Sequence, residues 1–159
     1  MEEIAAPRLL EAGDETQDFD CGVDVLNGWL KKRAMPNHLS GASRTYVATA
    51  GKRVAAFYCL SAGSTLYASA PGAIRRNMPE PIPVLVMGRL AVDVRFQKRG
   101  VGPLLLLHAL ERTKELAKGT GIRALLVHAK DEQAAHFYKR FGFVESPDDP
   151  LILIVRVSF

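Results

Sequence analysis

The sequence predicts a single domain of mixed α/β architecture. Its 159 residues suit one domain with a substantial core. Hydrophobic residues make up 48% of the chain and charged residues 24%, which is typical of a globular protein rather than a disordered one. Helical and strand-like patterns follow in the order helix, hairpin, strand, helix, strand, helix, strand. No linker, repeat or low-complexity stretch interrupts them, so we expect residues 1–159 to form one domain.

The first half of the chain predicts a helix, a hairpin and a loop. Residues 22–34 place apolar side chains at helical spacing, with Trp29 as the expected anchor. Residues 45–50 and 53–61 are strand-like runs that meet at Gly51-Lys52, a pattern typical of a hairpin. Residues 71–83 contain too many prolines for a regular element, so we expect a loop there.

The second half predicts three strands and two helices. Residues 83–92 form an apolar strand, and Gly88 within it indicates a bulge or a close backbone approach. The next helix is expected to end at Gly119 and Gly121, and its predicted apolar face consists of Leu106, Leu107, Leu110 and Ala117. Residues 122–129 and 151–157 are strand-like, and a helix capped by Asp131 lies between them.

A basic, glycine-rich turn, Gln97–Gly102, joins the long strand to the long helix. Gly100 and Gly102 allow positive φ and close backbone approach, and Pro103 suits the first helical turn. Unpaired N–H groups at a helix N-terminus favour anionic oxygens. In open α/β sheets, ligands bind at the carboxyl ends of strands where neighbours diverge. The turn therefore predicts a pyrophosphate site.

The pattern Q-x-x-G-x-G in this turn resembles the acyl-CoA-binding signature of the GCN5-related N-acetyltransferases (GNAT). It differs from a P-loop and from a dinucleotide-binding fingerprint. About 35 residues later, a second segment resembles the other half of that signature, through Ala134, Phe137, Tyr138, Gly142 and Phe143. The resemblance implies the GNAT fold: an α/β domain whose mixed, mostly antiparallel central sheet is flanked by helices and splayed at the acetyl-CoA site.

The resemblance also assigns expected roles to residues. Acetyl-CoA would be the co-substrate, and no metal is expected. Backbone N–H groups at a bulge near residues 90–92 could polarise the thioester carbonyl, as an oxyanion hole does. The expected acetyl-CoA contacts are Leu90, Ala91, Val92, Gln97, Lys98, Arg99, Gly100, Val101, Gly102, Pro103 and Asp131. Asp131 stands where the family often has asparagine.

Tyr138 is the candidate catalytic residue. It is one step off the stripe of Phe137, Phe141 and Phe143, which we expect to be core anchors, so its phenol could face a cleft and protonate the departing CoA thiolate. The plain alternative is a half-buried tyrosine with a solvated hydroxyl.

No residue stands out as a general base. His108 and His128 are expected to be structural, whereas His136 could lie exposed beside Tyr138. Asp93 and Glu132 remain candidates for deprotonating an amine, although spacing singles out neither. Neither the histidines nor Cys21 and Cys59 make a metal-ligand cluster, and the cysteines are expected to be buried thiols.

The charge of the chain is unevenly distributed. Residues 1–20 carry seven acids against one arginine, whereas residues 21–144 carry 19 Lys/Arg against 7 Asp/Glu, a local net charge of +12. This excess predicts a polyanionic partner, with nucleic acid the leading candidate. The expected contacts are Lys31, Lys32, Arg75, Arg76, Arg89 and Lys139. Neither a signal peptide nor an apolar run of membrane-spanning length is present, so we expect a cytoplasmic protein without membrane contact.

A wider resemblance covers nearly all of residues 19–151. The segments that carry it are 19–22, 26–30, 45–47, 58–64, 76–79, 82–84, 88–93 and 126–129, which look like the GNAT toxins of bacterial type II toxin–antitoxin modules. This family acetylates the α-amino group of the amino acid on charged tRNA and so stops translation. The resemblance implies a homodimer held inactive by a ribbon-helix-helix antitoxin, with promoter DNA bound only through the antitoxin.

Two other functions stay open at this stage. A small-molecule amine or polyamine acetyltransferase would favour an acid-rich substrate pocket, which the basic excess does not suggest. The other alternative is a pseudo-enzyme or DNA-associated binding subunit without catalysis, which would keep CoA only as a ligand.

Overall fold

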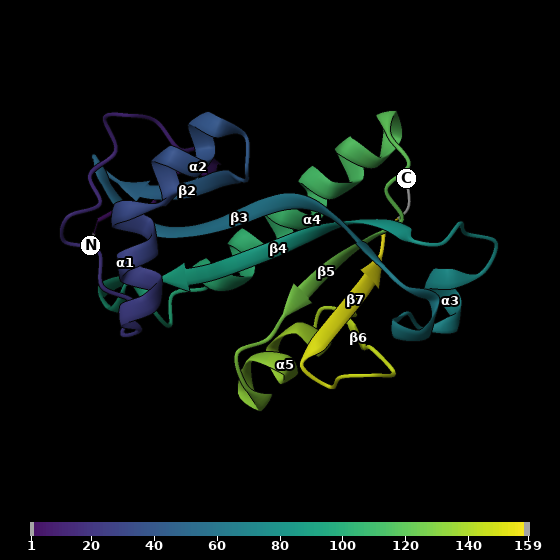
Figure 1. Cartoon of the computed structure of the whole chain (residues 1–159). Helices are drawn as coiled ribbons and strands as arrows, with labels where there is room; N and C mark the ends of the chain where they lie inside the picture. Colours follow the sequence, from purple (N-terminus) through teal and green to yellow (C-terminus); the bar gives the residue numbers. More distant parts are fainter. Residues whose placement is uncertain (1, 158–159) are drawn as a thin grey trace. The chain divides into compact units, whose positions relative to one another are not determined.

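The computed structural model describes residues 2–157, which form two compact units (Figure 1). Unit 1 comprises residues 2–61 and 89–109, and unit 2 comprises residues 62–88 and 110–157. The strands follow the order β1-β2-β3-β4-β5-β7-β6 in one sheet. The pairs β1–β2, β2–β3, β5–β7 and β6–β7 are antiparallel, and β4–β5 is parallel. The predicted fold class, a mixed and mostly antiparallel sheet, is therefore confirmed.

Unit 1 is built around the β2–β3 hairpin. Its elements are β1 (Arg8–Leu9), α1 (Asp24–Lys32), α2 (Ala34–Ser40), β2 (Arg44–Ala50) and most of β3 (Arg53–Thr65), followed by the end of β4 (Ile82–Val92), the 3₁₀ turn η2 (Val94–Phe96) and the start of α4 (Val101–Gly119). The hairpin turns at Gly51-Lys52 as predicted, with Ala50 opposite Arg53. The helix predicted at residues 22–34 is α1, which ends where Arg33 (φ −113°) breaks helical geometry. The sequence did not predict α2, which follows and ends at a left-handed cap at Gly41.

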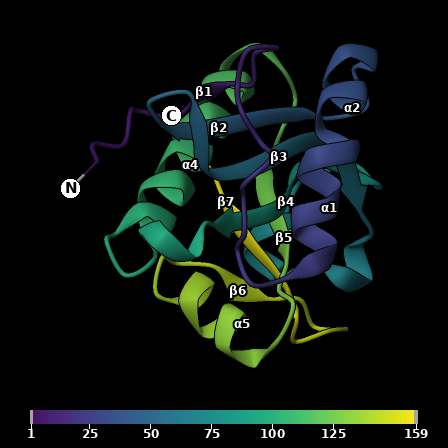
Figure 2. The same cartoon turned by 90° about the vertical axis from the view of Figure 1, so that its left-hand side faces the viewer.

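The two faces of the hairpin bury different partners, because successive strand side chains point to opposite sides. On one face, Phe57 stacks on Trp29 of α1, with ring centroids 6.0 Å apart and planes within 8°. On the other, the Tyr58 hydroxyl lies 2.6 Å from Nδ1 of His108 in α4. Helix α1 and the start of α4 thus cover opposite faces of this hairpin (Figure 2). Trp29 is the anchor that the sequence predicted.

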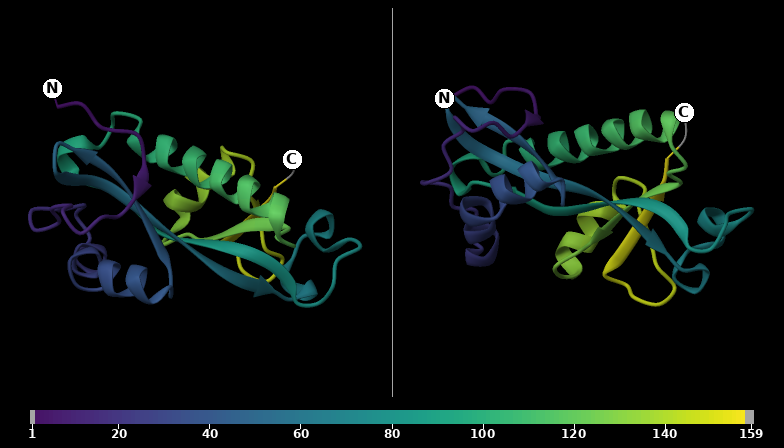
Figure 3. Two further views of the ribbon diagram at one scale, coloured as in Figure 1. Left: turned by 90° about the horizontal axis from the view of Figure 1, so that it is seen from above. Right: turned by 45° about the horizontal axis from the view of Figure 1, so that its top comes forward.

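Unit 2 holds the parallel part of the sheet. Its elements are the end of β3, η1 (Tyr67–Ser69), α3 (Gly72–Arg75), most of β4, the rest of α4, β5 (Ala124–His128), α5 (Glu132–Lys139), β6 (Val144–Glu145) and β7 (Ile152–Arg156). The loop expected at 71–83 contains α3, which follows Pro71 directly and buries Ile74 against Ile82, Val84 and Ile154. Helix α3 lies beside β7 (Figure 3). Ile74 thus anchors this four-residue helix, and hydrogen bonds from Arg123 to its carbonyls hold it as well.

Helix α4 buries two of the four residues predicted for its apolar face, Leu106 and Ala117, while Leu110 is half-buried and other residues complete the stripe. Leu105, Leu106, Ala109, Thr113 and Ala117 are buried, whereas Leu107 is 51% exposed. These positions recur about every four residues, and the small Ala109 and Thr113 allow close packing that hydrophobicity alone does not reveal. Within residues 2–157, no helix combines the length and apolarity needed to cross a bilayer.

Candidate active site

Strand β4 separates from β5 before it ends. The parallel pairing runs from Val84–Ala124 to Met87–Val127, whereas β4 itself continues to Val92. Two residues after the last pair, Arg89 takes the left-handed conformation (φ 60°), so the backbone irregularity expected at Gly88 lies at its neighbour. Its guanidinium sits over the Trp29 ring, 4.4 Å from the centroid, an attraction that offsets part of the cost of positive φ.

The glycine-rich turn leads into the N-terminus of α4, where free backbone N–H groups can bind an anion. Lys98 and Gly100 take positive φ (62° and 77°), and the first helical bond runs from Leu104 N–H to Gly100 C=O at 3.2 Å. The N–H groups of Val101 and Gly102 precede that bond and have no helical acceptor. A Cβ on Gly100 would meet nothing within 4 Å, so this side of the turn is open. Gly102 does not use the conformational freedom that glycine allows, because it lies in the first turn of α4.

These features fit the pyrophosphate of acetyl-CoA. The turn offers free N–H groups at a helix N-terminus and two adjacent basic side chains. Arg99 donates to the Glu2 carbonyl at 2.9 Å and lies 5.3 Å from the Phe96 ring centroid, so its position is fixed. The Lys98 ammonium has no partner within residues 2–157 and is available for a phosphate.

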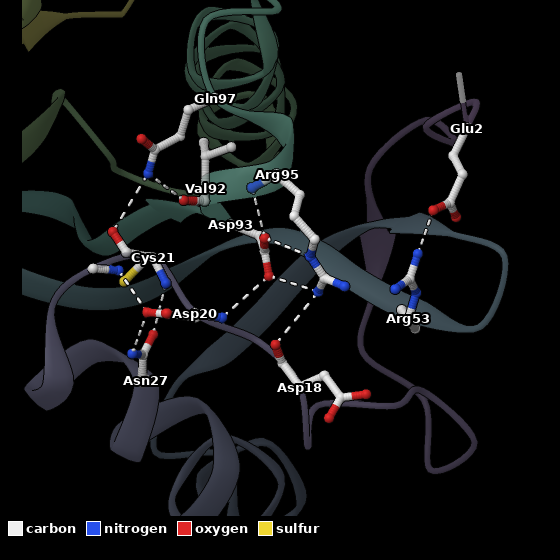
Figure 4. Close-up of polar contacts among 11 residues, drawn as sticks. Glu2, Asp18, Asp20, Cys21, Asn27, Arg53, Val92, Asp93, Arg95 and Gln97 are labelled. Carbon is white, nitrogen blue, oxygen red and sulfur yellow. Dashed lines mark hydrogen bonds and ion pairs between the residues drawn. The ribbon is translucent and has the colours of Figure 1, made fainter.

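Gln97, the first residue of the signature, turns its side-chain amide toward the protein. Nε2 donates to the Val92 carbonyl at 2.9 Å and to the Cys21 carbonyl at 3.4 Å (Figure 4). The amide therefore ties the end of β4 and the segment before α1 to the entry of the turn. Gln97 acts through the position of the turn rather than by presenting this nitrogen to phosphate.

Asp93 anchors the same junction from within the protein. Its carboxylate is fully buried and accepts hydrogen bonds from Arg95 Nε (3.0 Å), Arg95 Nη2 (2.9 Å), the Arg95 backbone N–H (2.9 Å) and the Asp20 backbone N–H (3.1 Å) (Figure 4). Burial raises the pKa of Asp93, but these bonds outweigh it and hold the pKa below the usual aspartate range. An enclosed carboxylate with a lowered pKa is a poor base, so the idea that Asp93 deprotonates an amine is not supported.

Replacing Asp93 by asparagine should lower the free energy of unfolding at pH 7 by roughly 1.5–3 kcal/mol, the range for hydrogen bonds to a charged group. Because the folded pKa lies below the unfolded one, the ionised carboxylate stabilises the fold above about pH 4 and loses this effect as pH falls through the folded value. Urea unfolding at pH 7, 5 and 3 should show the gap between wild type and Asp93→Asn closing with acid. An equal gap at all three pH values would contradict this, and exposed Glu111→Gln serves as the control.

Tyr138 projects inward from α5, whose N-terminus is capped by Asp131 as predicted, with its carboxylate accepting from Ala134 N–H at 2.8 Å. Tyr138 is only 8% exposed, and its ring packs on Phe137 and Phe143 with centroids 5.3 and 5.5 Å apart. The prediction that Phe137 and Phe141 are core anchors while Tyr138 lies off the buried face is therefore wrong. Tyr138 is buried, whereas Phe137 and Phe141 are half-buried. Ala135, three residues before Tyr138, is also buried, so the two side chains share one face of α5.

The Tyr138 hydroxyl is nevertheless available to a ligand. It has no hydrogen-bond partner within residues 2–157, and the one unpaired, fully enclosed side-chain polar atom of that range is Ser43 Oγ, so the phenol keeps contact with solvent. Burial raises the pKa of Tyr138 to about 12. The group is therefore protonated at neutral pH and can donate a proton.

The histidines and cysteines do not form a second reactive centre. His38 is buried, accepts the Thr45 N–H on Nδ1 at 3.2 Å, and has its pKa lowered by burial and by Arg44. His108 forms a hydrogen bond with Tyr58, which agrees with its expected structural role. His128, for which the same role is expected, is exposed, and so is His136. Cys59 is buried, which raises the pKa of its thiol to about 11. Across the described residues, no group of three His, Cys, Asp or Glu could hold a metal.

The six basic residues expected at a nucleic-acid surface are all exposed. Lys31 and Lys32 lie in the last turn of α1, and Arg89 belongs to the same unit. Arg75 and Arg76 lie at the end of α3 in unit 2. Lys139 is already paired with Glu145 at 2.5 Å, so among the six residues it is the weakest candidate for a nucleic-acid contact.

Comparison with known proteins identifies the family. The acetyltransferase (GNAT) domain family matches residues 41–145, which include the splayed strand, the turn and helix α5. The chain belongs to the GNAT acetyltransferases. It is 44% identical over 158 residues to the tRNA-acetylating toxin of Mycobacterium tuberculosis (strain ATCC 25618 / H37Rv), covering 99% of this chain and 95% of that protein.

Solved GNAT structures resemble the chain over most of its length. AtaT complexed with acetyl-methionyl-tRNAfMet superposes with a TM-score of 0.89 at 28% identity, over 97% of this chain and 95% of that one. A tyrosine-to-phenylalanine variant of AtaT, bound to the C-terminus of the antitoxin AtaR and to acetyl-CoA, gives a TM-score of 0.82 at 26% identity, over 98% and 94% of the two chains. The GNAT fold implied by the sequence motifs is thus confirmed.

Proposed function

We propose that this GNAT enzyme transfers the acetyl group of acetyl-CoA to the α-amino group of aminoacyl-tRNA and thereby inhibits translation. The observation that carries the proposal is the 44% identity, over 99% of the chain, to a tRNA-acetylating toxin. The exposed lysines and arginines and the local charge of +12 are compatible with a tRNA substrate, whose phosphates attract such side chains without sequence preference.

Different residues of the chain bind the co-substrate, polarise its carbonyl and position the proton donor. Acetyl-CoA supplies an activated acetyl thioester. The turn Gln97–Gly102 and Pro103 hold its pyrophosphate, and the backbone of Leu90, Ala91 and Val92 polarises the thioester carbonyl. Asp131 caps α5 and so positions Tyr138. We assign no base, because the α-amine of an aminoacyl ester is weakly basic and has a neutral fraction near pH 7.

The attacking amine forms a nitrogen–carbon bond to the acetyl carbonyl and releases one proton to water. As the carbon–sulfur bond breaks, Tyr138 gives its proton to the departing sulfur and regains one from solvent. A phenol with a pKa of about 12 is a weak acid toward a solvated thiolate. Desolvation raises thiol pKa values too, and in this chain burial raises the pKa of Cys59 to about 11. A CoA sulfur desolvated beside Tyr138 would likewise be more basic than in water, which reduces the pKa difference that the proton transfer has to overcome.

We further propose that residues 1–159 act as one GNAT domain, since the family match at 41–145 runs through residues of both units. The AtaT–AtaR complex supports an antitoxin partner. We expect that partner to have a ribbon-helix-helix domain and to provide the contact with promoter DNA, and we expect the enzyme to be a homodimer. Since charged tRNA is its substrate, we place the activity in the cytoplasm.

Labelled acetyl-CoA and total charged tRNA test the reaction. Label should enter the RNA fraction only when the tRNA is aminoacylated, and mild alkaline deacylation should release it as N-acetyl amino acid. Label on polyamines or other free amines would instead favour the small-molecule enzyme. Binding of CoA without any transfer would indicate a non-catalytic subunit.

Neutralising the end of α1 should weaken tRNA recognition without changing the chemistry. In Lys31→Gln/Lys32→Gln, the slope of log affinity for tRNA against log salt should fall by about 1–2, since each phosphate contact contributes about 0.7–0.9. The matched control is Lys114→Gln/Lys118→Gln, which removes two lysines already paired with Glu111 and Glu115. Equal slopes for the two double variants would remove α1 from the interface.

A further inference from the structure

Unit 2 contains a small cavity whose charged side chains are all arginines. It has a volume of about 220 Å³ and is lined by Ala73, Arg76, Asn77, Arg123 and Arg156. The arginines come from the end of α3, the approach to β5 and the last residue of β7. No carboxylate lines this cavity, so three positive charges share one small space.

Arg123 is held in place in the cavity lining by hydrogen bonds to backbone carbonyls. Arg123 donates through Nε to the Ile74 carbonyl at 3.0 Å and through Nη2 to the carbonyls of Ala73 (3.3 Å) and Arg76 (3.4 Å). Burial and the neighbouring charge of Arg156 lower the pKa of Arg123. The repulsion between these two guanidiniums is thus present in the fold and is relieved by an anion placed between them.

The other two arginines have donors to spare. Within residues 2–157, the guanidiniums of Arg76 and Arg156 make no hydrogen bond or ion pair, although each carries five N–H donors. Five acidic side chains of unit 2 are engaged elsewhere: Glu111, Glu115 and Glu145 with lysines, Glu80 with the Tyr67 N–H, and Asp148 with Ser69. The cavity therefore has donors and charge without an internal acceptor.

We propose that this cavity binds a phosphate group of the tRNA backbone, an inference that rests on the proposed function. Arginine forks match the two free oxygens of a phosphodiester. A water molecule takes about 30 Å³ of the liquid, so the cavity has room for a phosphate group with several waters. Ala73 is the only apolar side chain in the lining, which favours a phosphate over the acidic side chain of a peptide that would also need apolar contacts.

The variants that test this site are Arg76→Gln and Arg156→Gln, alone and combined, because Arg123 also holds α3. Lys118→Gln, which removes a lysine paired with Glu115, is the control. Titration with inorganic phosphate should show binding to wild type and the control that the double variant loses. With deacylated tRNA, the double variant should reduce the salt slope by about 0.7–0.9 and weaken binding by roughly 5- to 8-fold at 0.1 M salt, the effect of one phosphate contact. CoA affinity should not change.

Three outcomes would overturn the proposal. If the double variant keeps the wild-type salt slope, the cavity does not contact tRNA, while label transfer to charged tRNA by the wild type would still uphold the proposed function. If the double variant loses affinity for a polyglutamate probe but not for tRNA, the cavity accepts peptide carboxylates instead. If the wild type neither binds nor acetylates tRNA, the proposed function fails together with this site.

Discussion

Tyr138→Phe should lower the turnover number by roughly 10²-fold or more, the usual scale of a general acid, and leave stability almost unchanged. The substitution removes only the hydroxyl, which has no hydrogen-bond partner within residues 2–157, while the ring keeps its contacts with Phe137 and Phe143. The free energy of unfolding should therefore change by less than about 0.5 kcal/mol. Affinity for acetyl-CoA should persist, because the substitution leaves the turn Gln97–Gly102 unchanged.

Steady-state kinetics, CoA calorimetry and thermal melting of the same preparation separate these effects. Tyr67→Phe is the matched control, since Tyr67 is a half-buried tyrosine of the same unit. Because burial raises the pKa of Tyr138 to about 12, wild-type turnover should not decline between pH 8 and pH 10 through loss of this proton. Unchanged turnover in Tyr138→Phe would mean that water protonates the sulfur and that the tyrosine only packs.

Gly100→Val should reduce acetyl-CoA affinity by about 10²-fold or more. Gly100 has φ of 77°, a conformation that costs an L-residue roughly 1–2 kcal/mol and a β-branched residue more. The turn would shift to relieve that strain and carry the N–H groups of Val101 and Gly102 away from the phosphate. The new side chain would also occupy the open side of the turn.

Gly51→Val provides a control with the same backbone problem in another place. Gly51 has φ of 62° at the tip of the β2–β3 hairpin, and a Cβ there would also meet nothing within 4 Å. Both variants should lose similar stability, but only Gly100→Val should lose CoA binding by calorimetry. Wild-type affinity in Gly100→Val would remove the turn from the cofactor site.

Local signals in the sequence were enough for the parts of the site that depend on neighbouring residues. The strand, glycine turn and helix of 82–119 follow from apolar runs and from turn chemistry within a few residues. The cap of α5 by Asp131 is equally local. Short elements escaped prediction, because β1, α3 and β6 carry too few residues to show a period.

Features made by distant residues could not be read from the chain. Asp93 accepts a hydrogen bond from an N–H 73 positions earlier, and its burial makes it an anchor rather than one of the two candidate bases. Arg76, Arg123 and Arg156 form one cavity although the sequence separates them widely. The sequence places Tyr138 one step off the aromatic stripe, yet in the structure it lies on the buried side of α5 with its hydroxyl accessible.

The central claim is that the acetyl group reaches the α-amine of an amino acid on tRNA. A translating extract supplied with acetyl-CoA tests it most directly, by mass spectrometry of the amino acids released from its tRNA before and after the protein is added. We predict that N-α-acetyl amino acids appear on specific tRNAs as protein synthesis stops, and that Tyr138→Phe delays both together. Arrest of synthesis while every tRNA-bound amino acid keeps its free α-amine would contradict the account.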